Sequence, residues 1–303
     1  MNRRILRAQA FFIACVVAAA GGLGLLLISS PSHHRDTATP GLPPSLPRSA
    51  ILTRVEIEQK VVALTFDFDM TPGMLFRLQS GEVPAWYDPA VFDILHREAI
   101  PHTMFLTGLA TLAYPDLARS FARDPLIEIG NHSHRHLAFA PDCFGLPFIG
   151  EGRAQEDIET AQKTIRAITG AAPKYFRFPG GCLQKGDLGI VNHIGLRVVH
   201  WDVAAGDGFN PDAESIIRRV ETRARPGSII VFHVGGPNAP ETAEALQAII
   251  PYLKARGYAF ATVTGLLDIQ ACSKSEPALR RFFPLRLFFP AWKSPCPDSQ
   301  PVL

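Results

Sequence analysis

Short apolar, β-rich runs alternate with longer amphipathic stretches from Val61 to Thr262, and this alternation constrains the fold more than any other feature. Each β-rich run followed by a helical stretch predicts a βαβ unit, and successive units build a parallel sheet. The expected strands cover residues 61–68, 103–106, 127–129, 175–178, 198–201, 228–232 and 259–262, and the expected helices cover 88–99, 115–122, 154–168, 188–193, 213–224 and 242–256. We therefore predict an α/β fold, a distorted and incomplete (β/α)7-type barrel in a single catalytic domain.

Residues 1–30 predict an export signal. They begin with the basic sequence MNRRILR and continue as an apolar run to Ile28, broken only by Gln9. The run is nearly long enough to span a bilayer and lacks a clear small-x-small cleavage site, which favours an uncleaved membrane anchor over a removed signal peptide. The basic start places the rest of the chain outside the cytoplasm, either anchored with an extracytoplasmic catalytic domain or secreted or periplasmic after cleavage.

Composition divides the remainder of the chain into three segments. Residues 31–50 form a Pro-rich linker, 51–270 the domain with the alternating strands and helices, and 271–303 an aromatic and basic tail. The tail could contact a membrane surface or an envelope polymer, or it could pack on its own domain. Four arginines precede the first acidic residue, Asp36, so the rest of the chain is slightly acidic and no nucleic-acid partner is expected.

Four of the five cysteines, Cys143, Cys182, Cys272 and Cys296, follow the apolar run. An oxidising compartment would permit two disulfides in any of three pairings, and the sequence does not choose among them. Free buried thiols are the alternative.

Three histidines within five positions, His132, His134 and His136, follow the expected strand 127–129. In an extended segment His132 and His136 would lie too far apart to share one cation, whereas in a helical turn they would share a face and His134 would point elsewhere. The spacing therefore predicts a two-histidine metal site that needs a carboxylate from another strand. A His-rich surface turn is the alternative.

Polar residues follow the carboxyl ends of the expected strands, which is where active sites of α/β barrels form. Two long segments, Met70–Tyr87 and Leu137–Gly150, are expected to rim this face as loops. The polar residues are Asp67, Asp69, His132, Arg177, Asp202, Asp207 and His233.

Five sequence blocks in a fixed order resemble the polysaccharide deacetylase family, whose catalytic unit is the NodB-like domain of carbohydrate esterase family 4. They are Thr65-Phe-Asp67-Phe-Asp69, His132-x-x-x-His136, Arg177-Phe-Pro179-Gly180, Trp201-Asp202 with Asp207, and Val231-Phe-His233. The resemblance runs from about Val61 to Leu267. It implies a hydrolase of non-peptide carbon–nitrogen bonds that removes N-acetyl groups from an amino-sugar polymer or oligosaccharide. The export signal in turn indicates a substrate of the cell envelope. The resemblance also implies one divalent metal, for which we expect zinc, with cobalt or another divalent ion as the alternative.

The resemblance also implies roles for individual residues. Asp67 would be the catalytic base and His233 the catalytic acid. Arg177 would orient Asp67, and Asp207 would pair with His233, with Asp202 as the alternative partner.

The metal ligands implied by the resemblance are His132, His136 and an aspartate that usually follows the base. Phe68 occupies that position, so we assign the ligand role to Asp69. Asp67 and Asp69 would share one face of a strand, so a bulge or the end of the strand must reorient one of them. Gly180 matches a position whose backbone N–H helps bind the oxyanion.

Two other functions are compatible with the same residues. One is deformylation, or another carbon–nitrogen hydrolysis, on a small or lipid-linked substrate. The other is a catalytically silent sugar-binding domain, because Phe68, Ala204 and Gly208 replace usual residues of the family blocks. We expect His96, His102, His193 and His200 to be structural.

Overall fold

The computed structural model describes residues 50–282, with side chains through Lys274. The expected signal or anchor, nearly all of the linker and most of the C-terminal tail lie outside the described residues. Within residues 50–282, no helix combines the length and the apolar character needed to cross a bilayer.

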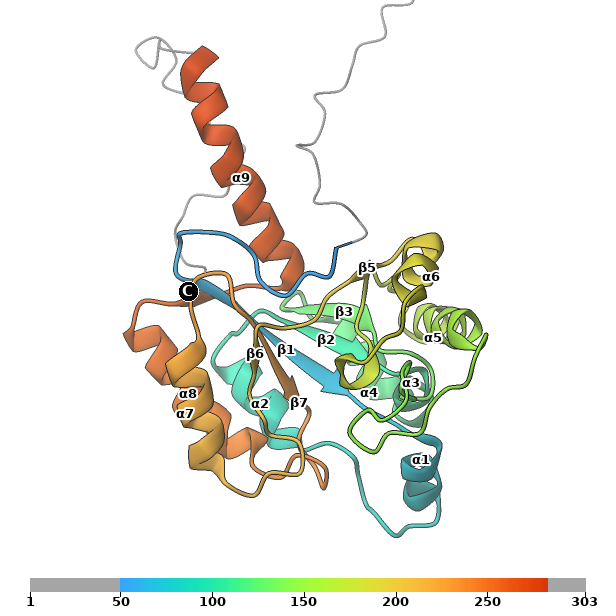
Figure 1. Ribbon diagram of the computed structural model, residues 1–303. Helices are drawn as coiled ribbons and strands as arrows, with labels where there is room; N and C mark the ends of the chain where they lie inside the picture. Colours follow the sequence, from blue (N-terminus) through green and yellow to red (C-terminus); the bar gives the residue numbers. More distant parts are fainter. Residues whose placement is uncertain (1–49, 283–303) are drawn as a thin grey trace, which may run out of the picture. The chain divides into compact units, whose positions relative to one another are not determined.

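The strands form one curled parallel sheet, so the predicted incomplete barrel is confirmed (Figure 1). Their order is β5-β4-β3-β2-β1-β7-β6, and β8 pairs with the start of β1. The strands are β1 (Val61–Phe68), β2 (His102–Leu106), β3 (Ile127–Asn131), β4 (Tyr175–Phe176), β5 (Arg197–Val198), β6 (Val203–Ala204), β7 (Ile229–His233) and β8 (Ala259–Phe260).

Helices cover the outside of the sheet, with α2, α7 and α8 on one side and α3 to α6 on the other (Figure 1). The helices are α1 (Pro72–Gln79), α2 (Pro89–Arg97), α3 (Gly108–Ala113), α4 (Pro115–Arg123), α5 (Ala154–Thr169), η1 (Pro179–Gly181), α6 (Asp187–Ile194), α7 (Ala213–Arg223), α8 (Thr242–Ala255) and α9 (Val263–Phe282).

Five elements, α1, α3, η1, β6 and α9, were not predicted. Helix α1 lies inside the segment Met70–Tyr87 that we expected to be a loop, and it has no buried residue that would produce an apolar period. Its start is nevertheless encoded, because Thr71 caps the helix and Pro72 opens it. Helix α3 is short, strand β6 has two residues that pair only with β7, and α9 continues into the expected tail.

Strand β1 is central to the fold, and both of its faces are buried. Ala63, Thr65 and Asp67 point into the barrel, while Leu64 and Phe66 pack outward among the helices. Burial on both faces explains the nearly continuous apolar sequence of this strand.

The barrel interior is apolar at one end and polar at the other. Leu52, Val55, Val263 and Leu266 form an apolar cluster with inward-facing residues of the strands, including Ala63. Asp67 and His233 occupy the last inward-facing positions of β1 and β7 and are paired in register. The open, polar end of the barrel is therefore its carboxyl end, as expected for the site.

Candidate active site

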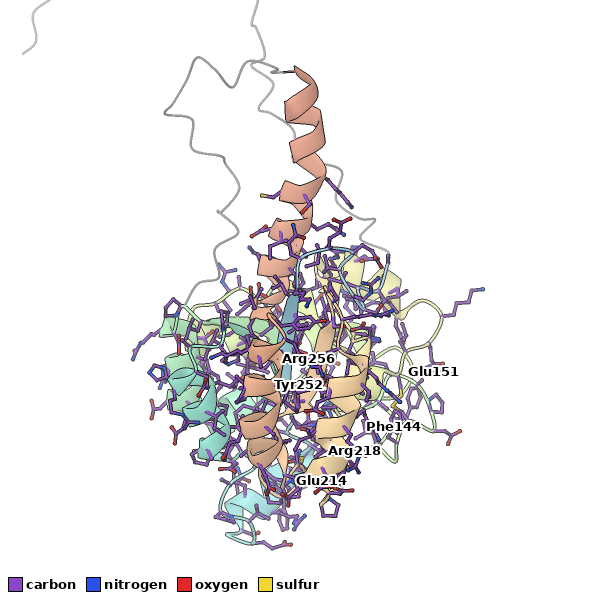
Figure 2. All side chains as sticks on the ribbon, turned by 90° about the vertical axis from the view of Figure 1, so that its left-hand side faces the viewer. Phe144, Glu151, Glu214, Arg218, Tyr252 and Arg256 are labelled. Carbon is purple, nitrogen blue, oxygen red and sulfur yellow. A yellow bond between two sulfur atoms is a disulfide. The ribbon has the colours of Figure 1, made fainter. Side chains whose placement is uncertain are left out.

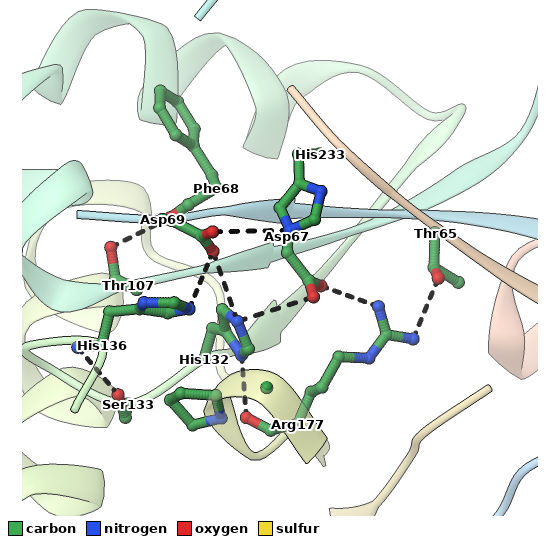
Figure 3. A network of polar contacts seen from close by, with 12 residues as sticks. Thr65, Asp67, Phe68, Asp69, Thr107, His132, Ser133, His136, Arg177 and His233 are labelled. Carbon is green, nitrogen blue, oxygen red and sulfur yellow. Dashed lines mark hydrogen bonds and ion pairs between the residues drawn. The ribbon is translucent and has the colours of Figure 1, made fainter. Parts of the chain in front are cut away.

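The carboxyl ends of four strands of the sheet bring the predicted site residues together (Figure 3). Asp67 ends the inner face of β1, His233 ends β7, and His132 and Arg177 directly follow β3 and β4. Their polar groups are almost fully buried, except that His233 remains partly exposed. The sheet thus brings distant parts of the sequence together in one small volume.

Asp69 reaches this volume because β1 ends at Phe68. The carbonyl of Phe68 accepts hydrogen bonds from the backbone N–H and hydroxyl of Thr107, at 3.2 and 2.9 Å. The Phe68 ring turns outward and stacks on Tyr114, with ring centroids 5.5 Å apart. A residue at position 68 therefore faces the helices, whereas Asp69 lies beyond the strand and points back to the site (Figure 3). The expected reorientation occurs at the end of the strand rather than in a bulge.

The two predicted histidines meet, but our expectation of a helical turn is wrong. Residues 132–136 form a tight non-helical turn in which Ser133 and His136 have positive φ angles of 68° and 51°. The backbone N–H of His136 donates to the Ser133 hydroxyl at 3.1 Å. This turn places the rings of His132 and His136 with their centroids 4.9 Å apart.

Helix α5 holds this turn through Asp157, a residue that our sequence analysis did not single out. The buried Asp157 carboxylate accepts from the backbone N–H groups of His134 and Arg135, at 2.7 and 3.3 Å. Its other oxygen accepts from Arg135 Nε at 2.7 Å. Asn131 adds a second support, because its side-chain oxygen accepts from the backbone N–H of Ser133 at 2.9 Å.

Asp69, His132 and His136 fit a divalent cation. Each offers one donor atom, and the three donor atoms lie within 4.8 Å of one another. His132 Nδ1 donates to the Arg177 carbonyl at 2.8 Å, so the Nε2 lone pair faces Asp69. Within the described part of the chain, Asp69 Oδ1 and His132 Nε2 are buried without hydrogen-bond partners, as expected for atoms that coordinate a metal.

The charges in this cluster are strongly coupled. Burial alone would raise the pKa of Asp69, but the facing His136 and His132 imidazoles lower it well below its ordinary value. Asp69 Oδ1 lies 3.1 Å from His136 Nε2 and 3.4 Å from His132 Nε2. Asp69 therefore presents an anionic carboxylate to any cation bound there.

Arg177 fixes the direction of Asp67. It is fully buried, and Nη1 donates to Asp67 Oδ1 at 2.7 Å while Nη2 donates to the Thr65 hydroxyl at 2.9 Å. The guanidinium also lies 4.0 Å from the Phe105 ring centroid. The free Asp67 oxygen, Oδ2, consequently faces the cluster, 3.6 Å from His132 Nε2.

His233 is paired with Asp207. Its Nδ1 lies 2.9 Å from Asp207 Oδ1, and the second carboxylate oxygen accepts from the His233 backbone N–H and the Thr242 hydroxyl, each at 2.7 Å. Burial alone would lower the pKa of His233, but Asp207 and the other carboxylates raise it to about 10. His233 therefore carries a proton and points Nε2 toward Asp69 Oδ2, 3.6 Å away.

Asp202 is not a partner of His233, so that alternative is wrong. Its carboxylate accepts from the Ser228 hydroxyl and the Ile229 backbone N–H, both at 3.0 Å, at the start of β7 rather than at its end. Thr242, on α8, is a contact of Asp207 for which the sequence carried no signal. His96, His102, His193 and His200 lie outside the metal-ligand cluster, as expected.

Gly180 lies in the short helix η1 beside a disulfide between Cys143 and Cys182. This disulfide accounts for two of the four cysteines that follow the apolar run, and Cys296 lies outside the described residues. The disulfide fastens the segment Leu137–Gly150 to the loop that follows Arg177.

An incomplete α/β barrel with two histidines and a carboxylate at its mouth, flanked by an Arg–Asp pair and a His–Asp pair, defines a class of metal-site hydrolases. A sequence model described as polysaccharide deacetylase matches residues 54–199. The chain belongs to this family, carbohydrate esterase family 4, and its relatives in the family include hydrolases of the amide bonds of N-acetylated sugars.

Several proteins of known name are similar to the chain. A peptidoglycan-N-acetylglucosamine deacetylase of Bacillus cereus is 30% identical, over 73% of this chain and 94% of its own. A chitooligosaccharide deacetylase of Azorhizobium caulinodans is 32% identical, over 68% and 94%. The structure of the Bacillus subtilis peptidoglycan deacetylase PdaC superposes with a TM-score of 0.58 at 26% identity, covering 76% of this chain and all of that one.

Proposed function

We propose that this chain removes N-acetyl groups from an amino-sugar polymer or oligosaccharide of the cell envelope. The observation that carries the proposal is the position of Asp67 and His233, which are paired in register across neighbouring strands and flank the cluster of Asp69, His132 and His136. A base and an acid beside a metal site are what amide hydrolysis requires. The names of the relatives support an N-acetylated saccharide as the substrate.

Asp69, His132 and His136 would hold the divalent cation, with zinc as the first candidate and cobalt as the alternative. When bound, this ion acidifies a water molecule and polarises the carbonyl of the acetamide.

The protein's own groups then move the protons. Asp67, held by Arg177, accepts a proton from the attacking water, and the water oxygen bonds to the acetamide carbon. The N–H of Gly180 donates to the negative charge that develops on the carbonyl oxygen. His233, held by Asp207, donates its proton to the departing nitrogen, so the carbon–nitrogen bond breaks and acetate and a free amine are formed.

The first test measures metal content and acetate release on the same samples of wild type and His132→Ala, with N-acetylated chitooligosaccharides as substrates. We expect about one metal ion per chain in the wild type and loss of both metal and acetate release in the variant. Metal without acetate release would favour deformylation or another acyl group. A wild-type chain that binds saccharide but no metal would identify a silent sugar-binding domain instead.

We further propose that the catalytic domain acts outside the cytoplasm, because residues 1–30 have the sequence of a signal or anchor. Protease added to intact cells, and then to spheroplasts, tests this placement. Protection of the domain in both preparations would contradict it.

A further inference from the structure

Phe144 and Phe209 are the two most exposed large hydrophobic side chains of the described residues, at 86% and 83% exposure. Both also have a left-handed backbone, with φ angles of 49° and 53°. Bulky residues rarely adopt this conformation, because their Cβ crowds the neighbouring backbone. Exposure and backbone strain both cost free energy, and residues held in this way cluster at functional sites.

Phe144 lies over Gly180, on the β4 side of the active site. A Cβ atom added at Gly180 would fall 2.6 Å from Cys143 Sγ and 3.2 Å from the Phe144 ring, so only glycine fits beneath this segment. The disulfide to Cys182 fixes Cys143, and the Cys143 carbonyl accepts from the backbone N–H of Leu146 at 2.8 Å. The backbone of Phe144 is therefore anchored while its ring faces solvent.

Phe209 lies on the other side of the site, next to the His–Asp pair. The preceding residue, Gly208, packs on His233, because a Cβ there would fall 3.2 Å from the imidazole Cε1. The backbone N–H of Phe209 donates to the Asn238 carbonyl at 2.7 Å. In the sheet, β4 and β7 lie on opposite sides of β1, so the two phenylalanines flank the catalytic groups.

We propose that Phe144 and Phe209 bind the sugar units on either side of the unit whose N-acetyl group is removed. The site would then select internal units of a saccharide chain. This inference rests on the proposed deacetylase function. An anchored aromatic ring offers a flat apolar surface to the C–H face of a sugar at little cost in conformational entropy. On the Phe209 side, a cleft of about 390 Å³ lined by Tyr87, Pro237 and Pro240 gives room for a further unit.

The charges near both rings favour a saccharide over a lipid surface. The segment around Phe144 carries Asp142 and Glu151 and no basic residue between them. After Phe209, Asp212 and Glu214 are ion-paired with Arg218, so this segment presents no excess of positive charge. Figure 2 shows Phe144 and Glu151 on the same side of the molecule. Membrane-binding loops usually combine apolar residues with lysine or arginine, which attract anionic lipids.

The test measures binding of N-acetylated chitooligosaccharides of one to six units to the metal-loaded full chain carrying Asp67→Asn, which slows turnover. Adding Phe144→Ala or Phe209→Ala should weaken binding of the longer oligosaccharides by about tenfold each and leave the monosaccharide unaffected. Phe144→Tyr and Phe209→Tyr should retain affinity because they keep the ring. The control is Phe76→Ala, which removes an exposed ring from the regular helix α1 and should change nothing.

The outcomes separate this inference from the proposed function. In the catalytically active chain, the alanine variants should raise KM for long substrates with little change in kcat. Unchanged affinity and KM in both variants, or an equal effect of Phe76→Ala, would overturn the inference even if acetate is released. Variants that lose binding to phosphatidylglycerol vesicles but keep saccharide affinity would also overturn it. The wild type could instead release no acetate and still bind longer oligosaccharides more tightly through Phe144 and Phe209. That result would remove the deacetylase proposal and support the two binding sites.

Discussion

Among single residues, Asp67 is the one whose substitution should separate chemistry from metal binding. It contacts Arg177 and lies near His132, yet it is not one of the three clustered ligands. Asp67→Asn should lower kcat for acetate release by about 10²–10⁴-fold, because the attacking water loses its proton acceptor. Metal content by atomic spectroscopy should stay at the wild-type level. Loss of the metal in this variant would instead make Asp67 a ligand.

Asp207 should control the pH range over which His233 acts as an acid. The Asp207 carboxylate raises the pKa of His233, so its neutral replacement must lower that pKa. In Asp207→Asn the high-pH limb of the kcat/KM profile should therefore move to lower pH, because His233 loses its proton sooner. Asp202→Asn is a useful comparison, because the described partners of Asp202 are groups near the start of β7 and Arg225. Equal shifts of the high-pH limb in both variants would show that the change in pH dependence does not arise from the His–Asp pair.

At the scale of elements, helix α5 and the turn after β3 form one unit. Asp157 on α5 accepts hydrogen bonds from two backbone N–H groups of the turn that carries His132 and His136. Asp157→Asn should weaken zinc affinity by about tenfold or more, because the two imidazoles lose their fixed separation. Competition with a chromogenic chelator measures this affinity. Glu156→Gln, an exposed neighbour on the same helix, should have no effect, and zinc affinity unchanged in Asp157→Asn would contradict the proposed support.

For the whole molecule, acid should destabilise the fold through His200. Burial and the adjacent Arg177 lower the pKa of His200 to about 4, below the ordinary value of 6.5. Between these values the unfolded chain binds more protons than the folded one, so this contribution is complete above pH 6.5 and is lost as the pH falls toward 4. The free energy of unfolding, measured in urea at pH 7 and pH 4.5, should fall less in His200→Gln than in the wild type. An equal fall in both chains would exclude His200 as a cause.

The sequence by itself determined the order of the major strands and helices. Apolar runs buried on both faces and amphipathic helices leave periodic signals that do not depend on the rest of the fold. It also placed Asp67, Asp69, His132, Arg177, Asp207 and His233 at the carboxyl edge, because parallel strands end at a common edge. Elements without an apolar period, such as α1 and β6, escaped this reasoning.

Only the tertiary structure decided how these residues meet. Asp202 and Asp207 are both close to the same expected strand end in sequence, but contacts from β7 and α8 separate their roles. The non-helical turn of His132 and His136 depends on a carboxylate from α5, and the Cys143–Cys182 pairing depends on two loops brought together by the sheet. Hydrogen bonds and disulfides between distant segments leave no local pattern, so neither spacing nor composition could have specified them.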